Sequence, residues 1–213
     1  MQLDEDSLAK YFPYYLTVEE KNGLLAELKK WPNPLDYYIS MYEDELLQGD
    51  TWTKVPIRDF ESGDVHQVDA IVLSNSCLVD PANHRDVSPK ITVAPLVDLG
   101  RYEALLKSKG IAQQRVEAQI QAIKAQQVYN IVYLPKGANI KADMIVMLDD
   151  AHSLPSQRLL SSISEGKNIK LATLSLPGFF LFLFKLSAHF CRFHENVKRS
   201  YPVSQSTASV TSH

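Results

Sequence analysis

The chain has 213 residues, of which 45% are hydrophobic and 22% are charged, and its formal net charge is −3. This composition excludes fibrous and low-complexity proteins, and two cysteines cannot form a disulfide framework. The longest apolar run, residues 176–184, is far shorter than the roughly 20 residues of a membrane span, and the acidic N-terminus is unlike a signal peptide. We therefore expect a cytoplasmic protein without membrane contact. The acidic first half and basic second half favour attraction within one molecule over a nucleic-acid surface, because no dense Lys/Arg cluster occurs.

Residues 1–48 are predicted to form an N-terminal helical extension. Thr17 and Glu20 have the spacing of a capping box, and leucines follow at helical intervals. After a proline-containing break, a second helix is expected over about residues 35–47. We interpret its tyrosine, leucine and isoleucine face as a packing surface.

Residues 49–199 are predicted to form the main domain, which begins with short strands separated by turns. Alternation and composition predict strands over residues 51–57, 69–74, 90–97, 128–134, 143–148 and 170–175. The run at 69–74 is mostly apolar, so we expect it to be buried on both faces. Several short strands with turn signals between them are typical of a small barrel.

Helical segments interrupt and end this β pattern. Residues 99–128 predict a helical insertion that divides near Gly110. A C-terminal helix is expected over residues 176–199, with Ser175 as its N-cap, and its many phenylalanines predict burial on nearly all sides. The polar tail, residues 200–213, is expected to be disordered.

The order of these segments resembles the PemK/MazF-like toxin family over about residues 49–195. Gly-Asp-Thr-Trp opens the first strand, Ala-Ile-Val-Leu-Ser-Asn is similar to the family's second core strand, and Thr-Val-Ala-Pro-Leu is similar to the next. An aspartate-bearing strand and the approach to the last helix also match. The chain further resembles a divergent bacterial group that shares a Ser-Asn-Ser-Cys motif. The matching segments are residues 49–52, 70–75, 92–96, 145–154, 158–159 and 171–175.

The resemblance implies an α+β protein whose SH3-like β-barrel carries N-terminal helices, the helical insertion and a C-terminal helix. It also implies RNA or an antitoxin-like protein as partner, and a homodimer. The family's toxins cleave RNA with an arginine just before the second strand and a hydroxyl just after the third strand's proline. Residues 65–69 contain no arginine, and residues 96–98 contain no hydroxyl. Cleavage by the 2′-hydroxyl builds negative charge that a preorganised donor must stabilise, so the fold is expected to persist without this machinery.

The loop that follows the second strand, residues 71–86, gathers reactive side chains. A catalytic interpretation makes Cys77 a nucleophile, or makes Asp80 and His84 an acid–base set. The expected binding residues of this loop are Ser74, Asn75, Ser76, Asn83 and Arg85. In the alternative interpretation, which we favour, the hydroxyl and amide groups satisfy the backbone where the strand turns, and the cysteine is a small buried apolar residue.

A second candidate lies at the end of the aspartate-bearing strand. Asp149 is a possible catalytic acid and His152 a binding residue, although an aspartate that caps the following turn is an equally good interpretation. Adjacent Asp149 and Asp150 point to opposite faces of a strand, so they cannot form a paired-carboxylate metal site. The spacing of His189, Cys191 and His194 does not match a zinc site. We predict neither metal nor cofactor.

The leading functional hypothesis is therefore a PemK/MazF-like barrel that lacks the ribonuclease residues and serves as an RNA- or protein-binding component. The resemblance implies a toxin–antitoxin or phage-defence setting. The alternatives are an active endoribonuclease with relocated catalytic residues, and a structural subunit that dimerises through the barrel.

Overall fold

The computed structural model describes residues 17–19, 22–23, 26, 36–79 and 86–190 of the chain. Within these residues the strands are β1 Tyr38–Ile39, β2 Thr51–Arg58, β3 Val65–Val72, β4 Lys90–Asp98, β5 Ile131–Leu134, β6 Met144–Met147, β7 His152–Pro155 and β8 Lys170–Leu174. The helices are α3 Ser76–Val79, α4 Leu99–Ser108, α5 Gln113–Lys124, α6 Ser156–Ser164 and α7 Leu176–Phe190.

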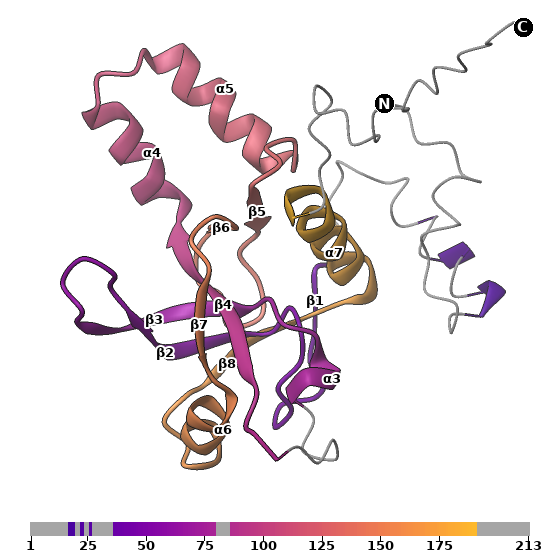
Figure 1. Ribbon diagram of the computed structural model, residues 1–213. Coiled ribbons are helices and arrows are strands. Elements are labelled where there is room, and N and C mark those ends of the chain that lie inside the picture. The colour runs from indigo at the N-terminus through magenta and orange to yellow at the C-terminus, as the bar shows by residue number, and fades with distance from the viewer. Residues whose placement is uncertain (1–16, 20–21, 24–25, 27–35, 80–85, 191–213) are drawn as a thin grey trace, which may run out of the picture.

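The strands form one antiparallel sheet that curls into a half-barrel, with helices at its ends and sides (Figure 1). The strand order is β1-β8-β2-β3-β4-β6-β5, and β7 also pairs with β4. The predicted α+β class is confirmed. All six strands predicted from alternation exist, because each presents apolar residues to a core that lies against the sheet.

Strand β4 is the branch point of the sheet, since it pairs with three other strands. Its middle pairs with β3 along one edge, whereas its first half pairs with β7 and its last residues with β6. Val93 illustrates this position, because it lies opposite Val72 of β3 and also opposite His152 of β7. Because β4 pairs with β3, β6 and β7, the segments that connect these strands lie close to β4.

Three apolar clusters support this arrangement. The first cluster packs Trp52 and Val55 of β2 against β3, β4, β7 and α6. The second joins the opposite faces of β3 and β4 to β5, β6, β8 and α7. The third packs α4 and α5 on β5 and β6. Residues 70–73 contribute to the first two clusters, so the predicted burial of the run at 69–74 on both faces is confirmed for these four residues.

The helical insertion and the start of the C-terminal helix agree with the predictions. Helices α4 and α5 are separated at Gly110, whose φ of 73° suits glycine. Ser175 is the N-cap of α7, because its Oγ accepts a hydrogen bond from the Gly178 N–H at 3.2 Å. The predicted burial of α7 on nearly all sides is wrong, since Phe184 and Phe190 are 49% and 60% exposed. Residues 191–213, which include the end of the predicted helix and the tail, lie outside the described residues.

The predicted helix over residues 35–47 is wrong across its described part. Tyr38–Ile39 instead form β1, which pairs with Leu174 and Thr173 of β8. Tertiary strand pairing here prevails over an apolar periodicity that suits a helix. Of the first predicted helix, residues 18–19, 22–23 and 26 are described, and they are helical.

Strand β7 and helix α6 were not predicted. Helix α6 follows Pro155 and has no side-chain cap, so the usual start signal is missing from the sequence. None of the helices in the described parts of the chain is long and apolar enough to cross a membrane.

Candidate functional site

The corner between β3 and α3 contains the hydroxyl and amide residues of the Ser-Asn-Ser-Cys motif, and each has a structural partner. Ser74 Oγ accepts a hydrogen bond from the Thr92 N–H at 2.7 Å. Ser76 Oγ accepts one from the Gln48 N–H at 2.8 Å, and Asn75 Oδ1 accepts one from the Cys77 N–H at 2.9 Å. The motif therefore fixes the turn to β4 and to the segment before β2, in agreement with the interpretation we favoured from the sequence.

Cys77 lies in the four-residue helix α3 and is exposed. Its interpretation as a buried apolar residue is wrong, because the short helix turns its side chain to the surface. Asp80, Asn83, His84 and Arg85 lie outside the described residues, so their predicted roles stay predictions.

The turn between β6 and β7 contains the second group of candidates. Asp149 and Asp150 are both exposed, so neither points into the core. Asp149 Oδ2 accepts a hydrogen bond from Asn130 Nδ2 at 3.4 Å, whereas Asp150 Oδ1 lies 2.9 Å from His152 Nε2. The imidazole and its carboxylate form a dyad with the geometry of a general base and its orienting group.

Strand β4 separates the two groups of candidates. Val72, which precedes the corner, and His152, which begins β7, face Val93 from opposite edges. Strands lie about 4.8 Å apart, so these two backbone positions are roughly 10 Å from each other. The two groups therefore line different edges of the same strand and do not form one compact catalytic set.

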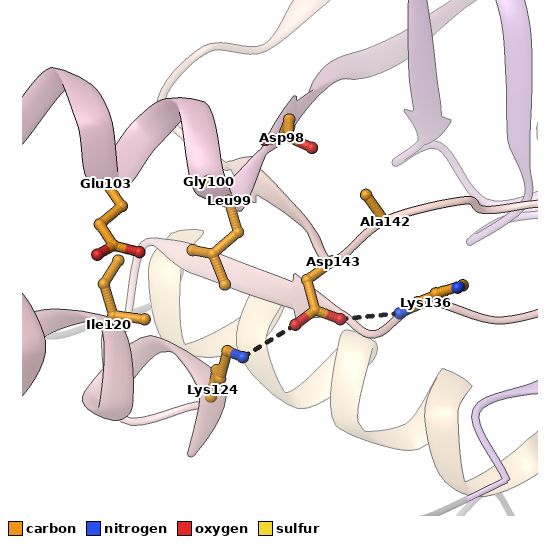
Figure 2. Close-up of a pocket in the computed structure, with 9 residues that line it drawn as sticks. All are labelled: Asp98, Leu99, Gly100, Glu103, Ile120, Lys124, Lys136, Ala142 and Asp143. Atoms are coloured by element: carbon orange, nitrogen blue, oxygen red, sulfur yellow. Dashed lines mark hydrogen bonds and ion pairs between the residues drawn. The ribbon is translucent and has the colours of Figure 1, made fainter.

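A cavity of about 440 Å³ opens where the helical insertion joins the half-barrel. Figure 2 shows that its walls come from the start of α4, the end of α5 and the loop between β5 and β6. The lining residues are Asp98, Leu99, Gly100, Glu103, Ile120, Lys124, Lys136, Ala142 and Asp143. Sequence reasoning missed this cavity, because three segments far apart in the chain build it.

Asp143 is the best-connected charge in the cavity (Figure 2). Its carboxylate lies 2.9 Å from Lys124 Nζ and accepts a hydrogen bond from the Lys136 N–H at 3.1 Å. Partial burial acts to raise the pKa of Asp143, but these two interactions outweigh it and hold the pKa below its usual value. The carboxylate is therefore charged at neutral pH and holds α5 to the β5–β6 loop.

The other two carboxylates of the cavity are also used within the molecule. Asp98 is the N-cap of α4, because its Oδ1 accepts a hydrogen bond from the Arg101 N–H at 2.8 Å. Glu103 forms an ion pair with Lys107 at 2.7 Å. Among the residues that the structure describes, the Lys136 ammonium has no ion-pair partner and faces solvent. The cavity is thus lined by apolar side chains, three carboxylates and two lysines, and among the described residues neither Asp98 nor Lys136 has an ion-pair partner.

The Gly-Asp-Thr-Trp motif contains a buried ion pair. Asp50 is fully buried, and its Oδ2 accepts a hydrogen bond from the Leu47 N–H at 2.9 Å and lies 2.7 Å from Lys170 Nζ of β8. The same ammonium lies 5.0 Å from the ring centre of Trp52. Burial raises the pKa of Asp50, although Lys170 and the Leu47 N–H act against this rise. The motif therefore joins β2 to β8 and takes no part in a surface site.

Lys185 of α7 is a second buried cation, only 4% exposed. Its Nζ donates to the carbonyl oxygens of Gln126, at 3.0 Å, and Val128, which follow α5. Burial lowers the pKa of Lys185 to about 8. Its side chain fastens the end of the insertion to the C-terminal helix.

Within the described parts of the chain, no group of three or more His, Cys, Asp or Glu side chains is placed to hold a metal ion. A scan against protein-family models finds no match, and a search of curated proteins finds no similar sequence. The chemistry of the molecule must therefore be inferred from its own residues.

Proposed function

We propose that this chain is a PemK/MazF-like barrel protein that binds a partner macromolecule and does not cleave RNA. The observation that carries this proposal is the structural role of the side chains at the Ser-Asn-Ser-Cys corner. Ser74, Asn75 and Ser76 each accept a backbone hydrogen bond, so the residues nearest to the expected active site hold the fold together.

The curled antiparallel sheet supports the barrel part of this proposal. The stretch in which the toxins have an arginine here falls in β3, over residues 65–69, and contains none. The stretch after Pro95 continues β4 through Leu96 and Val97, without a hydroxyl. These two stretches therefore supply no donor for a pentacoordinate phosphate at the positions where the toxins have one.

The proposed partner is RNA or an antitoxin-like protein, and the proposed setting is cytoplasmic toxin–antitoxin or phage-defence function. A homodimer formed through the barrel, as in the resembling toxins, belongs to the same proposal.

The second candidate is an active endoribonuclease, and the dyad of Asp150 and His152 favours it. The separation of 2.9 Å places the imidazole where a carboxylate can orient it as a base. In this case Asp149 of the same turn supplies a further catalytic group, since Cys77 lies beyond the other edge of β4.

Induced expression in bacteria, followed by growth curves and gel analysis of total RNA, separates the two candidates. A binding protein leaves growth and RNA intact, and the purified protein does not cleave RNA. Growth arrest with RNA decay, relieved by His152→Ala or Asp149→Ala but not by the exposed control Lys109→Ala, overturns the proposal and supports the enzyme. RNA affinity that falls steeply with salt identifies RNA as the partner, and salt-insensitive co-purification of one protein identifies an adaptor.

A further inference from the structure

Strand β5 is the last strand of the sheet, since β6 is its only strand partner among the described residues. Residues 129–134 around it, Tyr-Asn-Ile-Val-Tyr-Leu, contain no charge, proline or glycine. An uncharged segment of β-branched and aromatic residues at a sheet edge can pair with the same segment of another molecule, and proteins block such edges with charges, proline or a covering group. The outer edge of β5 therefore needs protection from outside the strand.

The Gln126 side chain pairs with the outer edge of β5 as a neighbouring strand would. Its Nε2 donates to the Tyr133 carbonyl oxygen at 2.7 Å, and its Oε1 accepts from the Tyr133 N–H at 3.1 Å. A strand offers the same two groups, one donor and one acceptor, to the residue opposite. This pair of hydrogen bonds, the glutamine cap, satisfies both backbone groups of Tyr133.

Other contacts close the two ends of this edge. Backbone N–H and C=O groups of a strand point the same way at every second residue, so Ile131 and Pro135 share the edge with Tyr133. The Ile131 N–H donates to the Val128 oxygen at 3.2 Å. Pro135 has no N–H, and its oxygen accepts from the Tyr38 hydroxyl at 2.7 Å. The glutamine cap therefore covers the middle of an edge whose ends are already closed.

The backbone of Gln126 is fixed as firmly as its side chain. Its φ of 55° lies in the left-handed region that favours glycine. Its N–H donates to the Ile123 oxygen at 2.8 Å, and its carbonyl oxygen accepts from Lys185 Nζ at 3.0 Å. A residue persists in such a costly conformation only when its surroundings hold it there. These contacts therefore keep the side chain against β5.

We propose that Gln126 takes the place of a strand on β5 and prevents β5 of one molecule from pairing with β5 of a second copy. Without the glutamine cap, two β5 edges would pair antiparallel about a two-fold axis. This role does not depend on what the protein binds, so it goes beyond the proposed function. The homodimer of that proposal would form in the wild type, whereas this pairing would form only when the cap is lost.

Sedimentation velocity of the full chain tests this role with three variants. Gln126→Ala removes both hydrogen bonds of the cap, so its weight-average mass should rise with protein concentration above that of the wild type. Gln126→Lys removes the same two bonds but places a charge on the edge, which opposes strand pairing, so it should sediment as the wild type does. Gln127→Ala truncates the exposed neighbouring glutamine and should also sediment as the wild type does.

Amide hydrogen exchange shows whether β5 is the contact. In the wild type the Tyr133 N–H should be protected by the glutamine cap, and this measurement requires no variant to fold. In Gln126→Ala, whose folding circular dichroism verifies, the same N–H should exchange faster in dilute solution and regain protection where the variant associates. Three results overturn the proposal: an unprotected Tyr133 N–H in the wild type, a folded Gln126→Ala that sediments as the wild type does, or equal association of Gln126→Ala and Gln126→Lys, which would indicate a general loss of stability.

Discussion

The buried ion pair between Asp50 and Lys170 allows a quantitative prediction. Lys170→Met removes the ammonium and keeps most of its apolar stem, so the Asp50 carboxylate, which is fully buried, loses its counter-charge. Removing one partner of a buried pair costs about 3–5 kcal/mol. At roughly 2–4 °C per kcal/mol for a chain of this size, the midpoint of thermal unfolding should fall by about 6–20 °C.

The loss of stability caused by Lys170→Met should depend on pH. Burial already raises the pKa of Asp50, and loss of Lys170 removes the main opposing interaction. In the variant, the folded carboxyl holds its proton at a pH where the unfolded one, with a pKa of about 3.9, has released it. Stability from this group is thus present below about pH 4 and is lost as pH rises through the folded pKa. The difference in unfolding free energy between wild type and Lys170→Met should therefore be larger at pH 7 than at pH 5.

Urea unfolding followed by circular dichroism measures this difference, with two controls. Lys167→Met removes a partner of Glu165 from an exposed ion pair of 2.5 Å and should cost less than about 1 kcal/mol. The double variant Asp50→Asn with Lys170→Met removes both charges and should be more stable than Lys170→Met alone. A Lys170→Met variant within about 1 kcal/mol of wild type at pH 7, or a double variant whose cost equals the sum of the two single costs, refutes this reasoning.

Three further changes test other contacts. Burial lowers the pKa of Lys185 to about 8 in the folded state. The free energy of unfolding of the wild type, measured by urea titration, should therefore rise by about 3 kcal/mol relative to that of Lys185→Met between pH 8 and 10.5. A difference between the two proteins that does not change with pH would contradict this. Ser74→Ala removes the acceptor of the Thr92 N–H and should cost about 1–3 kcal/mol of unfolding free energy, whereas no loss would mean that water replaces the hydroxyl. Gly178→Ala places a Cβ 2.6 Å from the backbone carbonyl oxygen of Tyr37. This clash should lower the melting temperature, although alanine favours helices. A higher melting temperature would show that α7 can move away from Tyr37.

The regular elements could be predicted where local pattern and tertiary contacts agree. Strand β4 presents its two faces to different clusters, as its apolar composition predicts, and Ser175 is a cap both in the sequence and in space. The prediction failed over Tyr38–Ile39, because pairing with β8 depends on residues more than 130 positions away. No local pattern contains that information.

Less of the candidate site than of the fold could be predicted from the sequence, because the site also depends on contacts between distant residues. The Ser-Asn-Ser-Cys motif could be interpreted as a turn, because its hydroxyl and amide groups act over short distances. The cavity arises only when segments separated in the sequence meet, and the exposure of Cys77 follows from the short helix α3, which was not predicted.

The position of strand β4 predicts the order in which parts of the molecule unfold. Its residues enter all three apolar clusters, with Val93 in the first, Ala94 in the second and Val97 at the third. The α4–α5 hairpin packs mainly within the third cluster, so it can unfold while the other two remain intact. Amide protons in the middle of β4 should therefore exchange with solvent only through global unfolding, whereas those of α4 and α5 exchange through a smaller opening. The insertion would then behave as a separate cooperative unit within a single sheet.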